Sequence, residues 1–227
     1  MNNFLFRSFL AVGFLCVIAG RSSATSIQNF EGGTVSPGST SLTLSACVPD
    51  ISEGKYVIGS IAHSCHEAWA PTMAQSGNNF LIANGSTAVG DVYTQTLTVI
   101  ANTNNTFSAW TTGLYSTGAA VLELRIYDGI GVLGTLLNST QFTTNLAAPG
   151  TGGGLAAAVW EQFSVTALTT SNTITLQVFN TNINAIGNDF GLDSLELVEL
   201  SQNTTPEPAT FLLAGSALLG LMVLRRK

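Results

Sequence analysis

The stretch 122–126, Leu-Glu-Leu-Arg-Ile, alternates apolar and charged residues at a period of two. In an extended chain its three apolar residues fall on one face, while Glu123 and Arg125 fall on the other. The stretch 173–178, Thr-Ile-Thr-Leu-Gln-Val, repeats the pattern with uncharged polar residues. Such alternation is typical of strands that bury one face against a core and leave the other polar.

The rest of the central chain has the composition of a β domain. Thr, Ser, Asn and Gly are abundant, whereas the helix-forming residues Lys, Glu and Arg are scarce. Further strands are expected at 92–101, 107–110, 159–165 and 195–200, separated by turn signals at 84–85, 102–105, 128–129, 149–154 and 180–188. Short strands with such spacers predict an all-β fold, a sandwich or jelly roll, in one domain at 25–204.

The amino terminus has the pattern of a secretory leader. Arg7 precedes an apolar stretch at 9–20, and small residues follow up to Ala24. This order predicts a signal peptide at 1–24 that is cleaved after Ala24. A membrane helix is the alternative, but the apolar stretch is short and polar residues follow it at once.

The carboxyl terminus contains an uncharged apolar run at 209–224. A Pro-Glu-Pro tripeptide precedes the run and three basic residues follow it: Pro206, Glu207, Pro208, Arg225, Arg226 and Lys227. As a helix the run would reach about 24 Å, and snorkelling by the basic residues can close the gap to a hydrocarbon core of about 30 Å. The run therefore predicts a single transmembrane helix. The basic residues after it would hold its carboxyl end in the cytoplasm. A plain tail anchor and a buried core helix are the alternatives.

This order of tripeptide, apolar run and basic end resembles the PEP-CTERM sorting signal of Gram-negative bacteria, here at 205–227. The resemblance implies that an exosortase-type enzyme cleaves near 206–208. The chain would then be an inner-membrane intermediate only transiently, before its release or attachment at the cell surface or in the extracellular matrix.

Once both targeting segments are set aside, the central domain is strongly acidic. Its only basic residues are Lys55 and Arg125, whereas every acidic residue except Glu207 lies within it. A domain with this charge is not expected to bind nucleic acid or to be attracted electrostatically to anionic lipid.

Cysteine usage agrees with export. Cys16 lies in the leader, so Cys47 and Cys65 are the only pair left, and an oxidising compartment predicts a disulfide between them. Such a bond would be worth about 3 kcal/mol on the chain-entropy account. The segment 63–67 also holds two His and one Glu around Cys65, which leaves metal binding as an alternative.

Several short strings along the domain point to one class of module. They are FLIANG at 80–85, VYTQTLTV at 92–99, TFSAW at 106–110, WEQ at 160–162 and GNDFGLDSLEL at 187–197. In this order they resemble a jelly-roll, galactose-binding-like β-sandwich, related in shape to carbohydrate-binding modules, over about 29–200. The related modules usually carry two acidic residues where this chain has Asp193 and Ser194.

The resemblance implies a structural calcium ion between the first and last strands, with Glu31, Asp189 and Asp193 as the candidate ligands. Two-residue spacing places Asp193 on the same face as Leu195, and a buried carboxylate needs a partner. That partner is a cation, or else Asp193 holds a turn by accepting backbone amides. No other cofactor is implied.

Sugar binding needs aromatic rings that are free to stack. Trp69 and Tyr115 lie near expected loops and are the candidates, while Trp110 and Trp160 lie in strand segments and are expected in the core.

We find no catalytic constellation in the sequence. The domain has only two histidines, three positions apart, no G-x-S-x-G motif and no recognisable carboxylate pair. The chain is therefore predicted to be an exported, non-enzymatic surface or extracellular-matrix protein, sorted by an exosortase and associated with exopolysaccharide or biofilm. A specific carbohydrate-binding module is the alternative, and an unrecognised hydrolase is the third hypothesis.

Overall fold

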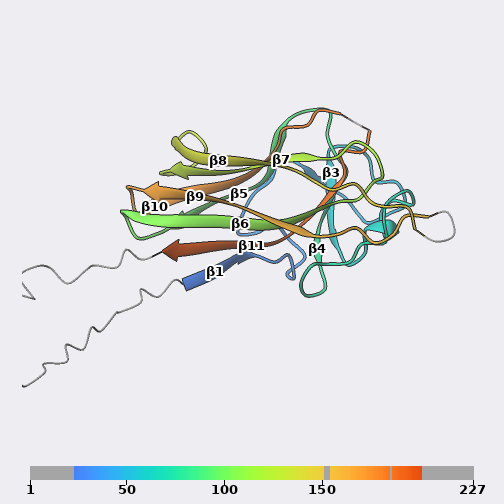
Figure 1. Cartoon of the computed structure of the whole chain (residues 1–227), viewed down its shortest axis with the longest axis horizontal. Coiled ribbons are helices and arrows are strands. Elements are labelled where there is room, and N and C mark those ends of the chain that lie inside the picture. The colour runs from blue at the N-terminus through green and yellow to red at the C-terminus, as the bar shows by residue number, and fades with distance from the viewer. Residues whose placement is uncertain (1–22, 151–153, 185, 201–227) are drawn as a thin grey trace, which may run out of the picture. The chain divides into compact units, whose positions relative to one another are not determined.

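The structure, a computed structural model, describes residues 23–150, 154–184 and 186–200. Within them the chain forms an all-β sandwich with one short 3-10 helix (Figure 1). The described residues contain no helix that is long and apolar enough to span a membrane. The sorting tripeptide, the apolar run, the basic end and all of the predicted signal peptide except Ser23 and Ala24 lie outside them.

Two sheets, antiparallel except for the β2–β3 pair, are built from eleven strands. The strands are β1 (Ser23–Gln28), β2 (Thr43–Leu44), β3 (Lys55–Gly59), β4 (Phe80–Ala83), β5 (Gly90–Thr98), β6 (Thr103–Gly113), β7 (Val121–Asp128), β8 (Thr135–Thr143), β9 (Glu161–Thr169), β10 (Thr173–Asn180) and β11 (Phe190–Leu200). The larger sheet has the order β2-β3-β4-β11-β6-β9, with β1 also paired to β11 and β2 parallel to β3. The smaller sheet has the order β5-β10-β7-β8. The predicted all-β sandwich is confirmed, and its arrangement is consistent with a jelly roll.

The alternating stretch at 122–126 forms β7 as predicted. Leu122, Leu124 and Ile126 are fully buried between the sheets, in one cluster with the apolar residues of β10. Each such side chain contributes about 1.5–3 kcal/mol on burial. The polar residues of both strands lie on the opposite face, so this face of the smaller sheet is directed away from the core.

One predicted turn is shorter than the sequence suggested. Of the residues at 102–105, only Asn102 occupies the turn, with a positive φ of 59°, and β6 begins at Thr103. Asn105 is fully buried inside the strand because its amide hydrogen-bonds the hydroxyls of Thr103 and Thr169. The amide nitrogen of a side chain that is typical of turns is thus paired within a sheet, while its Oδ1 has no hydrogen-bond partner among the described residues.

The amino-terminal strand begins before the predicted signal cleavage. Ala24 lies in β1 and pairs with Val198 of β11, and Ser23 pairs with Glu199. Cleavage after Ala24 would therefore leave β1 to start at Thr25, which pairs with Leu197.

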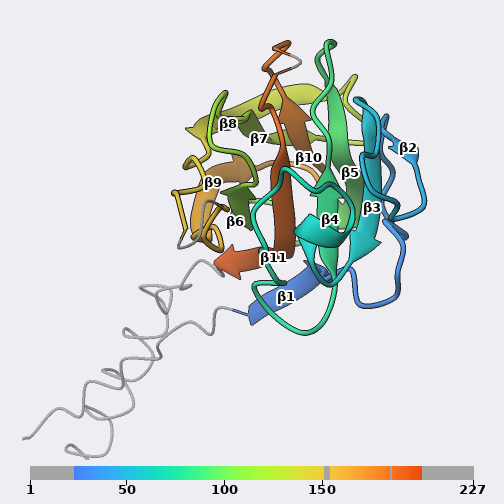
Figure 2. The ribbon, with the colours of Figure 1, turned by 90° about the vertical axis from the view of Figure 1, so that its right-hand side faces the viewer.

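A second apolar cluster lies outside the larger sheet. Val57 of β3 and Phe80 and Ile82 of β4 direct their side chains away from the main core and pack against Trp69. The chain between β3 and β4, residues 60–79, covers them, and we call it the covering loop. Figure 2 shows β3, β4 and β11 side by side on this part of the molecule. Because β4 is buried on both faces, it lacks the alternation that would have predicted it as a strand.

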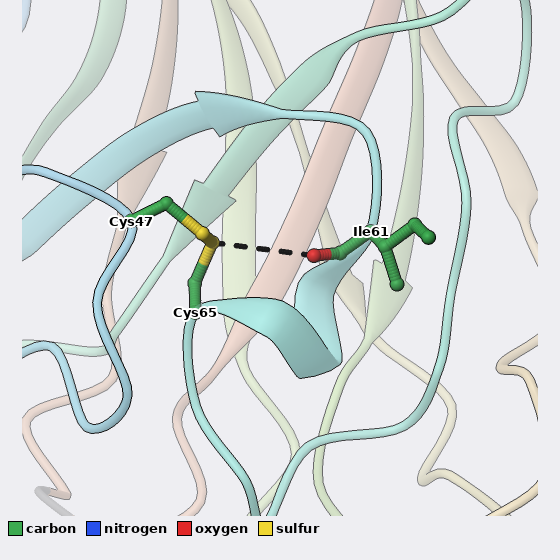
Figure 3. The surroundings of a disulfide bond; sticks show 3 residues. All are labelled: Cys47, Ile61 and Cys65. Atoms are coloured by element: carbon green, nitrogen blue, oxygen red, sulfur yellow. Dashed lines mark hydrogen bonds between the residues drawn. A yellow bond between two sulfur atoms is a disulfide. The ribbon is translucent and has the colours of Figure 1, made fainter.

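The predicted disulfide fixes the covering loop. Cys47, in the segment before β3, is bonded to Cys65, which follows the 3-10 helix η1 (Ala62–Ser64) (Figure 3). Cys65 is fully buried in the second cluster. The bond adds a covalent link between two segments that are also joined by the hydrogen bond from the Ile51 N–H to the Cys65 carbonyl at 3.2 Å. The metal alternative for this cysteine is excluded.

Candidate functional site

The three carboxylates predicted as calcium ligands all support the covering loop or the chain beside it. Asp193 Oδ2 accepts hydrogen bonds from the backbone N–H groups of Gln75 at 3.0 Å and Ser76 at 3.1 Å. Glu31 Oε1 accepts from the N–H groups of Asn78 at 2.7 Å and Asn79 at 2.8 Å. The loop thus presents donors to both carboxylates.

Asp189 binds elsewhere along the loop. Its Oδ2 accepts the indole N–H of Trp69 at 2.9 Å, and its Oδ1 accepts the N–H of Gly85 at 3.0 Å. Burial raises the pKa of Asp189, and the two hydrogen bonds oppose that rise. Desolvation likewise raises the pKa of Asp193, whereas the amides of Asn79 and Asn78 lower the pKa of the exposed Glu31.

The predicted direction of Asp193 is wrong. A β-bulge at Ser194, whose φ is 47°, shifts the register of β11 between Asp193 and Glu196. Leu192 and Leu195 therefore both point into the main core, and Asp193 is fully buried under the covering loop instead. A bulge breaks the period of two, so spacing alone misplaced this side chain.

In the structure these carboxylates accept hydrogen bonds from N–H groups. The described residues contain no group of three or more His, Cys, Asp or Glu side chains placed to hold a metal ion. Calcium needs six to eight oxygen ligands, and N–H groups cannot serve as ligands. The alternative that Asp193 holds a turn through backbone amides agrees with the structure. We propose that Glu31 and Asp193 hold the covering loop and not a calcium ion.

We therefore expect the melting temperature to be the same, within about 1 °C, in excess EDTA and in excess Ca²⁺. A structural calcium at about one hundred times its dissociation constant would add about 2.7 kcal/mol, or about 5–10 °C for a domain of this size. Thermal melts followed by circular dichroism measure this, with Glu31→Gln as the matched variant. A calcium-dependent rise that Glu31→Gln abolishes would contradict the proposal.

The structure corrects one of the two predicted sugar-binding aromatics. Trp69 is only 1% exposed, with its ring in the second cluster and stacked on His66 at 4.8 Å between centroids. It has no free face to offer a sugar. Tyr115 lies in the β6–β7 connection as expected, but it is half-buried and packs against the same cluster. Trp160, expected in the core, lies just before β9 and is only partly buried, packing edge-on against Phe80 at 5.4 Å between centroids at the border of the second cluster.

A cavity of about 340 Å³ lies beside the covering loop, lined by His63, Glu67, Trp69, Pro71 and Leu155 among others. Both histidines of this region bind backbone groups: His63 Nδ1 lies 2.8 Å from the Trp69 carbonyl oxygen, and His66 Nδ1 accepts the N–H of Ala68 at 3.2 Å. Because Trp69 is buried, its ring offers the cavity no free face on which a sugar could stack.

The outer face of the smaller sheet carries a second and more ordered set of polar groups. One row crosses all four strands in register: Thr94 of β5, Gln177 of β10, Arg125 of β7 and Ser139 of β8. Arg125 lies over the ring of Phe179, with the guanidinium carbon 4.0 Å from the ring centroid. We call this row and its flanking residues the polar face.

Hydrogen bonds fix the groups of the polar face. Arg125 donates to Glu123 at 2.6 Å and to Gln177 Oε1 at 3.2 Å, and the Tyr127 hydroxyl donates to the same oxygen at 3.1 Å. Gln177 in turn donates to Asp91 at 2.6 Å. The hydrogen bond from Arg125 holds the pKa of Glu123 below its usual range. The face is therefore a pre-ordered network of planar polar side chains.

Sequence reasoning identified three of the four strands of the polar face, all but β8, without assigning them a site. The alternation at 122–126 and 173–178 placed Glu123, Arg125 and Gln177 away from the core, which the structure confirms. One signal was present in the sequence: Arg125 is one of only two basic residues in the central domain. A lone arginine opposite an apolar strand face normally ends in solvent, so its position over Phe179 could not be anticipated.

Comparison with known proteins supports the export signal. Residues 204–227 match the PEP-CTERM protein-sorting motif. The chain is thus an all-β sandwich with the sorting signal of exported, surface-sorted proteins of Gram-negative bacteria. No curated protein matches the chain.

Solved structures resemble the sandwich at low sequence identity. A cyclase from Fischerella sp. TAU has a TM-score of 0.52 and 14% identity, covering 80% of this chain and 100% of the cyclase. The carbohydrate-binding module TmCBM61, in complex with β-1,4-galactotriose, has a TM-score of 0.46 and 14% identity, covering 74% of this chain and 92% of the module. A xylan-binding domain from Paenibacillus barcinonensis has a TM-score of 0.46 and 16% identity, covering 81% and 97%. At these identities the likeness concerns the fold alone.

Proposed function

We propose that this chain is an exported, non-catalytic protein of the cell surface or extracellular matrix that holds exopolysaccharide on its polar face. An exosortase-type enzyme releases it from an inner-membrane intermediate. The observation that carries the binding proposal is the cross-strand network of Arg125, Gln177 and their neighbours on the smaller sheet.

The chemistry of the polar face suits sugar hydroxyls. Planar guanidinium, amide and carboxylate groups form hydrogen bonds in fixed directions, and their partners within the network remove much of the rotamer entropy that binding would cost. Gln177 is only 2% exposed and orders the network from within it. A ligand would meet the partly exposed side chains of Arg125 and Glu123, which are 20% and 17% exposed.

Charge narrows the class of polysaccharide. Arg125 is neutralised by Glu123, at 2.6 Å, and Asp91 adds a further carboxylate to the face. The surrounding domain is also acidic. A uronic-acid polymer would be repelled, so the preferred ligand is a neutral polysaccharide.

The test uses the exopolysaccharide of the native host, separated into neutral and acidic fractions. In affinity electrophoresis we expect the neutral fraction to retard the wild-type protein and Arg125→Ala to bind about 10–100-fold more weakly. That loss corresponds to hydrogen bonds from a charged donor, worth about 1.5–3 kcal/mol. Arg125→Lys keeps the charge but loses the planar fork, and is also expected to bind weakly.

Two controls make the outcome specific. Thermal melts show whether each variant is folded, and Glu67→Gln with His63→Ala alters the cavity beside the covering loop without touching the polar face. Loss of binding in the cavity variants, with Arg125→Ala unaffected, would move the site to that cavity. Absence of binding to either fraction would refute carbohydrate binding, and release of reducing ends would refute the non-catalytic role.

A further inference from the structure

The turn between β7 and β8, residues 129–134, exposes apolar side chains to an unusual degree. Leu133 is 99% exposed and Ile130 is 80% exposed, the two highest values among the large apolar residues of the described chain. The sequence of the turn, Gly-Ile-Gly-Val-Leu-Gly, contains no charged or polar side chain. Single exposed apolar residues are common on protein surfaces, but a turn made entirely of apolar residues and glycine leaves no polar group between them.

The backbone of the turn is firmly held. The hydroxyl of Thr175 donates to the Gly129 carbonyl at 3.0 Å and accepts the N–H of Gly131 at 2.7 Å. Gly129 and Gly131 adopt φ angles of 94° and 73°, which only glycine takes up readily. Ile130 and Leu133 therefore project because the fold directs them outward.

The turn lies at the end of the sandwich where β11 ends. Gly129 donates to Thr173, and the neighbouring β5–β6 turn is joined to the β9–β10 turn through Val99 and Asn172. Figure 1 shows the β7–β8 turn, the start of β1 and the end of β11 at this end, which we call the exit end. Three more exposed apolar residues lie on the exit-end strands and turns: Ile100, Leu168 and Leu200.

Whenever the carboxyl-terminal run is inserted in the membrane, the short connection keeps the exit end near the membrane. Only residues 201–208 separate Leu200 from the apolar run at 209–224, and they reach about 28 Å when fully extended. The opposite end of the sandwich lies farther away by about the length of β11, roughly 36 Å. The apolar turn is thus at the end that the tether brings closest to lipid.

We propose that the exit end docks on the periplasmic surface of the inner membrane before sorting, with Ile130 and Leu133 inserted into the lipid interface. The inference rests on the membrane-attached stage of the proposed function. Docking would hold residues 206–208 close to the bilayer, where a membrane-embedded sorting enzyme can reach them.

The contact is apolar and not electrostatic. The turns of the exit end contain no basic residue, and its acidic neighbours accept hydrogen bonds from the protein: Asp128 from Ser171 and Thr170, and Glu199 from the N–H of Ile100. Two inserted side chains bind lipid weakly without a tether, because even a single acyl chain gives marginal attachment. The domain would therefore leave the membrane once the tether is cut.

A second copy of the chain is a poorer occupant of this surface. A stable protein interface buries about 800 Å² on each partner, far more than a six-residue turn provides. Lipid needs no complementary surface, so one protruding turn is sufficient for it.

The test uses the chain with its carboxyl-terminal run retained, purified from the native host as the variant with Pro206, Glu207 and Pro208 replaced by Ala. A polarity-sensitive fluorophore is attached at Leu133→Cys or, as the matched control, at Ile183→Cys in the exposed β10–β11 loop of the opposite end. Each introduced cysteine is the free thiol, because Cys47 and Cys65 are bonded and Cys16 leaves with the leader. The protein is reconstituted into phosphatidylethanolamine–phosphatidylglycerol vesicles that contain a lipid-borne quencher.

We expect several-fold stronger quenching at position 133 than at 183, and a loss of that difference when Ile130→Ser is added. Equal quenching at both positions, with the chain still resisting an alkaline wash, would overturn docking and leave the membrane stage intact. Removal of the chain by that wash would refute the membrane stage and docking together. Shielding of position 133 in detergent alone, rising with protein concentration, would show that a second copy covers the turn and would also overturn docking.

Discussion

Replacing Pro206, Glu207 and Pro208 by Ala is expected to stop release of the chain and leave it in the inner membrane of its native host. The motif match at 204–227 includes this tripeptide, and alanine removes both the fixed φ of the prolines and the charge of the glutamate. The wild-type protein should end near Thr205 and be found outside the inner membrane. Intact mass and cell fractionation measure both properties.

The matched control replaces Ser201, Gln202 and Asn203 by Ala. These residues lie just before the matched motif and supply the same length of chain. The control is expected to be released like the wild type. If the wild type and both variants keep the apolar run, the protein is a tail-anchored periplasmic protein, and the matrix function loses its main support.

Strands of the sandwich could be predicted from the sequence where apolar and polar residues alternate along the whole strand. Strand β7 buries one face, so Leu122 and Glu123 revealed both its direction and its place in the sheet. Strand β4 could not be found in this way, because Phe80 and Leu81 are both fully buried, on opposite faces. A local sequence does not show that a loop from elsewhere covers the second face.

The positions of single side chains were also hard to predict from local sequence, as Asp193 and Trp69 show. Burial of Asp193 and backbone amides as its possible partners were anticipated, but its direction was not, because the bulge at Ser194 turns the side chain toward the covering loop. Trp69 was predicted to lie near a loop, as observed. The prediction that its ring is exposed was wrong, because that loop forms a layer with its own apolar cluster. In both cases a long-range contact, more than a hundred residues apart in the sequence, decides the outcome.

Trp69→Ala is expected to give the largest loss of stability among single substitutions in the covering loop. The change removes a buried indole from the second cluster, which costs about 3–5 kcal/mol, and would lower the melting temperature by about 10 °C. It also leaves Asp189 Oδ2 without its donor. Thermal and urea denaturation measure the loss. A change of less than about 1 kcal/mol would contradict the packing of the second cluster.

Trp69→Phe separates the packing of the ring from its hydrogen bond. Phenylalanine keeps an aromatic ring but gives Asp189 no N–H, and an unsatisfied buried acceptor costs about 1–3 kcal/mol. Burial raises the pKa of Asp189 in the folded state above its value in the unfolded state. The protein therefore loses stability as pH rises through the interval between these two pKa values, because the carboxyl ionises more readily in the unfolded chain. Loss of the N–H donor raises the folded pKa further. The cost of Trp69→Phe should therefore be larger at pH 7 than at pH 4, where the carboxyl approaches its neutral form.

Trp160→Phe provides the control for this pH dependence. The Trp160 indole N–H donates to the Met73 carbonyl at 3.0 Å, so its loss leaves an acceptor that does not titrate. We expect the cost of Trp160→Phe, measured against the wild type at each pH, to be the same at pH 4 and pH 7. If Trp69→Phe behaved in the same way, the hydrogen bond to Asp189 would not be assisted by charge. The covering loop would then be held through Trp69 by packing and by an ordinary uncharged hydrogen bond.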